Sequence, residues 1–514
     1  MRLVFVRRVA QAFFLLLFLF LMVVADFRWA GGYPLNLFLS VDPLLAVSTA
    51  LAAHTLYAGM ILSLLVLVPT IFLGRFFCGW ICPMGTLNHA ASRLFASHDR
   101  KTQAEHNRYR PIMSVKYCVL AAMLVLAAFG VTQVGLLDPI ALLTRSLAAG
   151  FFPGAAVLTS GHGLPERLFV AGWAVGGVLI AVLLMNAVMP RFYCRVVCPL
   201  GALMGVVARL GVFQVYRSQS LCIQCDRCRA VCPAAADPQL RLRRSECFAC
   251  LNCREVCPVD AISLRALPAD HEAVPAPDVT RRRLLLTGTA ALLSVPLLKS
   301  SVRSSVLPPA GVIRPPGSEA EGEFLARCVK CGECMKVCPT NVIQPALLEG
   351  GVEGIWTPVM VNRVGYCDYQ CTLCGGVCPT GAIRNFSLDE KLGRPPFTKP
   401  IKIGTAFVDR TRCLPWAMNM PCIVCEEVCP VSPKAIYIER AEAVDSSGNK
   451  LVLQRPVIDP ARCIGCGQCE NRCPVFDHRA IRVTSVGETR SERNILLFRD
   501  AQPDVKQAEG EVEG

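Results

Sequence analysis

The sequence predicts an α-helical membrane domain of four helices with a parallel two-fold repeat, followed by α+β domains built around clustered cysteines. Three features lead to this prediction. Four apolar runs near the length of a bilayer span occupy the first part of the chain. Two copies of one cysteine motif follow the second and the fourth of these runs. Six further cysteine runs, each ending in Cys-Pro, fill the rest of the chain.

Composition supports a protein that lies partly in lipid. The 514 residues suffice for several domains, and 53% of them are hydrophobic whereas only 18% are charged. The 29 cysteines fall in tight runs, which favours metal clusters over disulfides. The net charge of +14 comes from arginines that crowd beside apolar runs, so it predicts membrane orientation and not nucleic-acid binding.

The four apolar runs are predicted to be transmembrane helices: Val9–Ala25, Leu56–Leu73, Tyr117–Val134 and Leu168–Val188. A cleaved signal peptide is the alternative for the first run. Basic residues precede the first run and fill the loop between the second and the third. The positive-inside rule therefore places the N-terminus and that loop in the cytoplasm, and predicts a multi-pass protein of a bacterial inner membrane.

The membrane domain, residues 1–215, contains an internal repeat. Residues 75–85 read RFFCGWICPMG and residues 191–201 read RFYCRVVCPLG. An Asp-Pro pair precedes each copy by a similar distance. Because both copies run in the same direction, an axis along the membrane normal would relate them and bring the two cysteine pairs together. The prolines that follow the second cysteines suit the first turn of a new helix.

The repeated thiols are candidates for a redox or metal relay at the cytoplasmic face: Cys78, Cys82, Cys194 and Cys198. The alternative is a pair of reduced thiols in a tight structural elbow. The repeated acids Asp42 and Asp138 are predicted to cap helices before an N1 proline. A second hypothesis gives these two acids, together with His54, to proton handling and binding of a quinol.

Residues 216–268 form a predicted cytoplasmic domain with two C-x2-C-x2-C-x3-C-P runs. This spacing is a specific signal for [4Fe–4S] ligation, in which the first three thiolates hold one cluster and the fourth ligates its neighbour. One cluster is predicted on Cys222, Cys225, Cys228 and Cys257. The other is predicted on Cys247, Cys250, Cys253 and Cys232.

Residues 311–490 form a predicted domain with four more runs. The outer two are regular: Cys328, Cys331, Cys334, Cys338 and Cys463, Cys466, Cys469, Cys473. The inner two are irregular: Cys367, Cys371, Cys374, Cys378 and Cys413, Cys422, Cys425, Cys429. This symmetry favours a nested pairing of outer with outer and inner with inner runs, although pairing of sequence neighbours satisfies the same spacing. The whole chain would then hold about six [4Fe–4S] clusters in ferredoxin-like α+β domains.

A linker, residues 269–310, separates the cluster domains, and a polar tail, residues 491–514, ends the chain. The linker contains Thr280-Arg281-Arg282-Arg283 before a short apolar segment. Twin arginines before a modest apolar run are typical of a Tat signal, and the alternative is a cytoplasmic linker helix. A Tat route would place the four-cluster domain in the periplasm.

These motifs resemble known protein families over nearly the whole chain. Residues 1–265 resemble the NapH/MauN-type membrane ferredoxins, and residues from about 280 resemble the four-cluster ferredoxins of NapG/MauM type. The phrase Gly311-Val-Ile-Arg-Pro-Pro-Gly317 belongs to the second resemblance. The resemblance implies a fusion of two proteins that pass electrons from quinol toward a periplasmic reductase.

The function expected from the sequence is membrane-bound electron transfer from the quinol pool to a periplasmic oxidoreductase or cytochrome. The chain would be a component of a quinol dehydrogenase and not a stand-alone enzyme, since no acid–base catalytic constellation stands out. One rival is a cytoplasmic ferredoxin-to-quinone entry module. Another is an assembly or maturation factor for a metalloenzyme.

Overall fold

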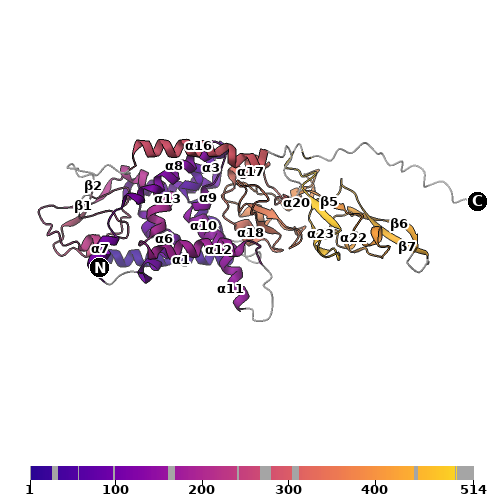
Figure 1. The fold of residues 1–514 in the computed structure, drawn as a ribbon, viewed down its shortest axis with the longest axis horizontal. Coiled ribbons are helices and arrows are strands. Elements are labelled where there is room, and N and C mark those ends of the chain that lie inside the picture. Colours follow the sequence, from indigo (N-terminus) through magenta and orange to yellow (C-terminus); the bar gives the residue numbers. More distant parts are fainter. Residues whose placement is uncertain are drawn as a thin grey trace, which may run out of the picture.

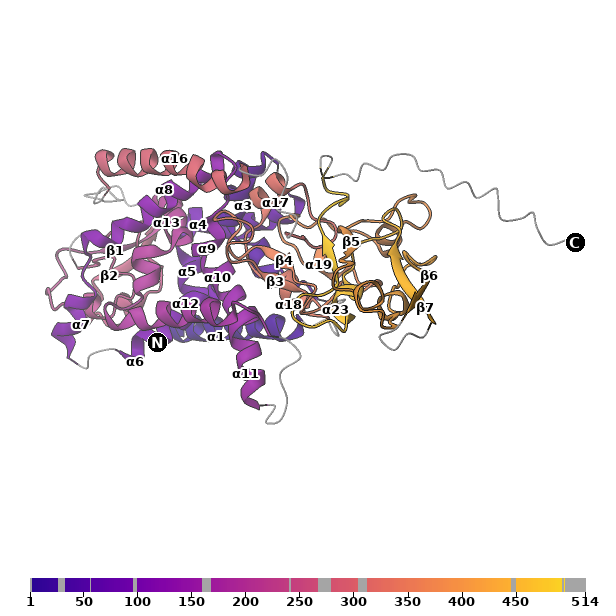
Figure 2. The ribbon, with the colours of Figure 1, turned by 45° about the vertical axis from the view of Figure 1, so that its right-hand side comes forward.

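The computed structural model describes residues 2–25, 33–55, 57–95, 99–159, 168–239, 242–266, 279–303, 312–444, 450–491 and 494. Most of the predicted tail, part of the linker and Gly311 lie outside these residues. Within them, the chain has a helical region between two cysteine-rich regions (Figures 1 and 2).

The helical region consists of one long helix, several short ones and connecting 3-10 and π segments. Its α-helices are α1 (Arg2–Val24), α2 (Leu37–Ser40), α3 (Pro43–Ala53), α4 (Leu64–Leu73), α5 (Phe76–Trp80), α6 (Pro83–Leu94), α7 (Arg100–His106), α8 (Val115–Ala128), α9 (Val134–Leu137), α10 (Pro139–Arg145), α11 (Phe152–Thr159), α12 (Gly172–Leu184) and α13 (Pro199–Val207). Buried apolar side chains from α1, α3, α8, α10, α12 and α13 form one core.

Two of the four predicted spans, the first and the third, overlap helices that are long and apolar enough to cross a membrane, although the third was predicted to extend beyond Ala128. These helices are Leu3–Val24 and Pro111–Ala128. The runs predicted as the second and fourth spans form shorter apolar helices, Ala58–Leu73 and Gly172–Ala187. Two long apolar helices also occur in proteins outside membranes, so a four-span arrangement stays a prediction.

The smaller cysteine-rich region lies at one end of the helical region. An antiparallel pair of strands closes it, β1 (Phe213–Arg217) and β2 (Ile262–Ala266), with Val215 opposite Leu264. Two short helices, α14 (Arg227–Ala230) and α15 (Asn252–Glu255), lie between the strands in sequence. Short helices and one hairpin-like sheet around cysteine runs agree with the predicted α+β ferredoxin-like architecture.

The helix α16 (Arg281–Arg303) returns along the helical region and packs against α8. Both views show it on the outside of the helical region, alongside α8 (Figures 1 and 2). Lys299, near its end, donates a hydrogen bond to the carbonyl oxygen of Phe129 just beyond α8, at 2.6 Å. The 23-residue helix is longer than the short segment that the sequence suggested.

The larger cysteine-rich region lies at the opposite end (Figures 1 and 2). Its helices are α17 (Glu321–Arg327), α18 (Glu333–Val337), α19 (Leu373–Gly376), α20 (Leu388–Leu392), α21 (Leu414–Ala417), α22 (Val424–Glu427) and α23 (Gln468–Arg472). Its strands are β3 (Ile343–Pro345), β4 (Pro358–Met360), β5 (Thr405–Val408), β6 (Ile436–Val444), β7 (Lys450–Ile458) and β8 (Ile481–Thr484). The antiparallel pairs are β3 with β4, β5 with β8 and β6 with β7.

Candidate electron-transfer centres

Each repeated C-x3-C-P motif forms an elbow between two helical segments. Cys82 and Cys198 are the N-cap residues of α6 and α13, and proline follows each as the first helical residue, as the sequence predicted. The N–H of Gly85 donates to Cys82 Sγ at 3.4 Å, and the N–H of Gly201 donates to Cys198 Sγ at 3.2 Å. The two elbows therefore share the same N-cap geometry, although an α-helix precedes Cys82 and a π-helical segment precedes Cys198.

The four repeated thiols lie near one another inside the helical region. Cys82 and Cys198 are buried in its core, and Cys78 and Cys194 pack against the same core. Each of Cys82, Cys194 and Cys198 has Cys78 among its electrostatic neighbours. The structure thus brings both pairs into one group, hereafter the thiol group.

The smaller cluster region docks onto both elbows through one phenylalanine. The guanidinium groups of Arg75 and Arg191 pack on the Phe248 ring, 4.9 Å and 5.0 Å from its centroid. Phe248 follows the cluster cysteine Cys247, and a Cβ atom on Gly79 would lie 2.9 Å from the Phe248 carbonyl oxygen. The arginine that opens each repeat therefore positions the cluster loop against the thiol group. Sequence reasoning noticed these arginines as part of the repeat but did not assign them this role.

A buried carboxylate fixes the same loop. Glu246 is 3% exposed and forms ion pairs with Arg75, at 3.0 Å, and with Lys116. The hydroxyl of Tyr117 donates to its other oxygen at 2.9 Å. A buried charge is tolerated only when it is paired and hydrogen bonded, and Glu246 meets both conditions.

The thiols of the smaller cluster region form two groups. Cys232 and Cys250 are buried in one hydrophobic cluster against which Cys78 and Cys247 pack. Cys253 is buried in a second, against which Cys228, Cys247 and Cys257 pack. Charge interactions separate the two sets, because Cys253 interacts most with Cys250, Cys247 and Cys232, whereas Cys228 interacts with Cys222 and Cys225. The motif spacing and these contacts fit two [4Fe–4S] clusters, of which the first lies directly beside the thiol group.

The larger cluster region groups its cysteines by neighbouring runs. Charge interactions between the thiols define four sets. The sets are Cys328, Cys331, Cys334 with Cys378; Cys367, Cys371, Cys374 with Cys338; Cys413, Cys422, Cys425 with Cys473; and Cys463, Cys466, Cys469 with Cys429. The nested pairing favoured from the sequence is therefore wrong, because helices of adjacent runs pack on each other, α18 on α19 and α22 on α23.

Burial keeps the thiols of the larger cluster region protonated as long as no metal is bound. Burial, with a contribution from Cys378, raises the pKa of Cys328 to about 11. Burial and the neighbouring thiols likewise raise the pKa of Cys425 to about 12. Bound iron would hold such sulfurs as thiolates. The spacing of the cysteines within the two regular runs is the spacing of [4Fe–4S] ligands.

The two halves of the larger region meet between cluster sets. The N–H of Cys367 donates to the carbonyl oxygen of Cys466 at 2.8 Å. Beyond this junction, Cys413, Cys422, Cys425 and Cys473 line one cavity at the far end of the chain. The four sets thus form a series that leads away from the helical region.

The first set of this series docks on the helical region. Arg145 Nη1 donates to the carbonyl oxygens of Gly135, at 3.0 Å, and Lys330, at 2.8 Å. Lys330 Nζ donates to the side-chain oxygen of Gln133 at 2.5 Å. Cys331 is buried in the same hydrophobic core as the thiol group.

The structure brings together only two of the three residues that the sequence assigned to a quinol site. Asp42 and Asp138 cap α3 and α10, as predicted, and both are fully buried. His54 is exposed at the opposite end of α3. The two acids meet, but His54 does not join them.

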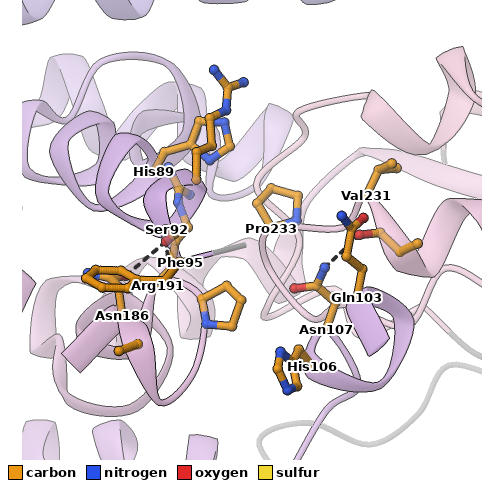
Figure 3. Close-up of a pocket in the computed structure, with 14 residues that line it drawn as sticks. His89, Ser92, Phe95, Gln103, His106, Asn107, Asn186, Arg191, Val231 and Pro233 are labelled. Carbon is orange, nitrogen blue, oxygen red and sulfur yellow. Dashed lines mark hydrogen bonds between the residues drawn. The ribbon is translucent and has the colours of Figure 1, made fainter. Parts of the chain in front are cut away.

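A cavity of about 220 Å³ lies between the helical region and the smaller cluster region. Figure 3 shows His89 and Arg191 on one side of it and His106 and Asn107 on the other. His89 Nε2 is buried without a hydrogen-bond partner. Among the described residues no acidic side chain lines the cavity, and burial together with nearby arginines lowers the pKa of His89 to about 2, so its imidazole is neutral. The sequence did not single out this histidine.

The comparisons with known proteins fit the cluster chemistry. The ferredoxin-type protein MauM of Methylorubrum extorquens is 35% identical over 212 residues, which are 40% of this chain and 88% of that protein. NapG of Escherichia coli is 30% identical over 227 residues, 42% of this chain and 90% of that protein. The chain belongs to this MauM/NapG family of ferredoxin-type proteins.

Further matches extend beyond the part shared with MauM and NapG. The 4Fe-4S binding domain family matches residues 55–102 and again residues 171–217, each with one C-x3-C-P motif. The 4Fe-4S dicluster domain family matches residues 327–382 and 397–476. The protein NirI of Paracoccus denitrificans is 31% identical over 34% of this chain and 24% of its own length. No solved structure matches. This member of the MauM/NapG family is therefore an iron–sulfur electron-transfer protein with several [4Fe–4S] clusters.

Proposed function

We propose that this protein carries electrons from the quinol pool, through its helical region, to a periplasmic oxidoreductase or cytochrome. In this proposal a NapH/MauN-type membrane ferredoxin and a MauM/NapG-type ferredoxin are fused in one chain. The observation that carries it is the shared core of the helical region. That core contains the thiol group and also Cys331, the buried cysteine of the docked cluster set.

The cysteines form a series from one end of the molecule to the other. Cys78 packs against the cluster that contains Cys232 and Cys250. The thiol group follows, then Cys331, and then the remaining sets of the larger region. Such a series supports a relay role for the thiol group, as a metal centre or as redox-active thiols.

The contacts of α8 support a transmembrane arrangement of this series. Lys116 and Tyr117, at its start, bind Glu246 of the smaller cluster region. Thr132, just beyond its end, donates to the carbonyl oxygen of Ala326 in the larger region, at 2.5 Å. Because α8 belongs to a candidate membrane span, the two cluster regions would lie on opposite sides of the membrane. The helix α16, after Arg281-Arg282-Arg283, would carry the chain back across.

The cavity beside His89 is the proposed quinol site. A quinol hydroxyl would donate to the unpartnered Nε2 of neutral His89. Val231 and Pro233, which flank the cluster cysteine Cys232, form part of the cavity wall. A ring bound there would lie next to the first cluster of the series. The buried acids Asp42 and Asp138 have no exposed surface to offer a quinol.

Anaerobic mixing of the nanodisc-embedded protein with duroquinol tests this function. We expect bleaching of the visible cluster absorbance. Replacing Cys198 by Ser should slow the reduction of the larger cluster region by about tenfold or more. Cys118→Ser, on α8, is the matched control, since Cys118 lies outside the thiol group. Absence of bleaching would contradict quinol oxidation, and an unchanged rate in Cys198→Ser would contradict the relay.

Protease protection in spheroplasts tests the topology. Replacing Arg281, Arg282 and Arg283 by lysine keeps the charge but removes the arginines that a Tat receptor reads. The larger cluster region should then be protected from external protease, although it is cleaved in the unaltered protein. Equal protection of both proteins would show that this region stays in the cytoplasm.

A further inference from the structure

Two buried carboxyl groups from equivalent positions of the repeat meet in the helical region. Asp42 and Asp138 are both 0% exposed. Oδ1 of Asp42 accepts the N–H groups of Leu44, at 2.8 Å, and Leu45, at 3.3 Å. Oδ1 of Asp138 accepts two N–H groups in the same way, both at 2.9 Å. One oxygen of each acid is thus fully used in capping its own helix.

The second oxygens are what distinguish this pair from ordinary caps. Oδ2 of Asp42 and Oδ2 of Asp138 are buried, and neither accepts a hydrogen bond from any other group of the described residues. Each carboxyl group has the other among its electrostatic neighbours, so a hydrogen bond between the two groups is the bond that their second oxygens can still form. Two ionised carboxylates cannot form that bond, because each is an acceptor only. One proton between them satisfies both oxygens and leaves a single negative charge.

A metal cation is a weaker occupant for this position. A hard cation requires several oxygen ligands, and the described residues place no third acidic or imidazole group with these two that could complete a metal site.

The surroundings connect the acids to the electron path. Tyr193, the residue before Cys194 of the thiol group, donates its hydroxyl proton to the carbonyl oxygen of Leu137, next to Asp138. Arg145, which holds the docked cluster region through Lys330, binds the carbonyl oxygens of Gly135 and Leu136 on the other side. The charged and titratable groups that act on Asp138, or on which it acts, are Arg145, Tyr193 and Cys82.

We propose that Asp42 and Asp138 share one proton and form an internal proton site that takes up a second proton when the neighbouring centres are reduced. The electron comes from the reductant and the proton from water, so one negative charge enters and one carboxylate is neutralised. Reoxidation releases the proton. This proposal deepens the proposed electron path, but the shared proton does not depend on quinol as the donor.

Infrared difference spectroscopy at pH 8 tests the site, with dithionite as the reductant so that quinol oxidation is not required. Reduced-minus-oxidised spectra should show gain of a protonated-carboxyl C=O band that shifts in D2O. Asp42→Asn and Asp138→Asn should each shift or abolish that band, because only one carboxyl group then remains at the site. Asparagine also caps helices, and its amide can donate to the remaining carboxylate, so folding should be retained.

Asp99→Asn is the matched control, since Asp99 also caps a helix but is exposed to solvent. It should leave the band unchanged. A carboxyl signal that does not change with reduction would overturn the redox-linked uptake. A wild-type spectrum identical to those of both Asp42→Asn and Asp138→Asn would overturn the shared proton. Loss of quinol oxidation with the band intact would contradict the proposed function alone.

Discussion

At the scale of single residues, equivalent side chains of the two repeats have equivalent roles. Each repeat supplies a cysteine that caps a helix, and each supplies an arginine that packs on Phe248. Residues outside the repeat complete the sites, as His89 does in the cavity. Two predictions follow the chemistry of individual side chains.

Replacing His89 by Leu removes the unpartnered acceptor of the cavity. We expect the KM for duroquinol to rise by about 2- to 10-fold, which corresponds to one hydrogen bond of about 0.5–1.5 kcal/mol. Cluster absorbance should be unchanged. His54→Leu, at the exposed histidine first assigned to quinol, is the control and should leave KM unchanged. The opposite result would move the quinol site to the end of α3 near His54.

Replacing Glu353 by Gln should remove a pH-dependent loss of stability. Burial raises the pKa of Glu353 from 4.5 to about 7. The folded state therefore favours the protonated acid. The contribution of Glu353 to the free energy of unfolding is fully present below about pH 4.5 and is lost as the pH rises through about 7. At pH 8 the variant should be more stable than the parent by about 1–3 kcal/mol.

Thermal loss of visible circular dichroism between pH 5 and pH 8 measures this difference. The exposed Glu349 of the same loop provides the control, Glu349→Gln. Parallel pH profiles of the parent and Glu353→Gln would show that Glu353 is not the responsible group.

At the scale of elements, the connection between the helical region and the larger cluster region depends on close backbone approach. A Cβ atom on Gly135, in α9, would lie 1.8 Å from the carbonyl oxygen of Val329. Both backbones are held in place, because Arg145 donates hydrogen bonds to the carbonyl oxygen of Gly135 on one side and to that of Lys330 on the other. Glycine is therefore required for docking.

Gly135→Ala should weaken this docking without changing any cluster ligand. Overpacking of this kind costs about 1–3 kcal/mol or more. We expect faster proteolysis at the junction and, after mixing with duroquinol, reduction of the larger cluster region slowed by about tenfold or more. Gly177→Ala, in α12, is matched because a Cβ atom there meets nothing within 4 Å. Equal rates in both variants would contradict electron transfer through the docked contact.

At the scale of the whole molecule, the two cluster regions lie at opposite ends of the helices (Figure 1). Six cysteine sets imply about 24 irons and about 24 sulfides per chain in anaerobically purified protein. An iron content above this value that decreases when Cys78 is replaced by Ser would indicate a metal centre in the thiol group. An iron content of about 16 per chain, the value expected for four clusters, would mean that one pair of sets is not assembled.

Much of the candidate site was predictable because its signals are local. The C-x2-C-x2-C-x3-C-P spacing predicts the cluster ligands, and the Asp-Pro and Cys-Pro pairs predicted the helix starts that the structure has at α3, α10, α6 and α13. The quinol hypothesis at Asp42, Asp138 and His54 used only their order along the chain. Burial of the acids and the position of His54 depend on packing, which that order does not encode.

The sequence by itself determined the cluster chemistry, the repeat and the composition of both cluster regions, since each depends on spacing within a short stretch. Only the tertiary structure decided which runs share a set, that Phe248 lies between two arginines, and that Cys331 joins the core of the thiol group. The residues that make these contacts are about 30 to about 250 positions apart in the sequence, and ligand spacing is satisfied equally by several pairings. The packing of neighbouring helices, α18 on α19 and α22 on α23, selects among them, and pairing of neighbouring runs closes shorter loops, which costs less chain entropy.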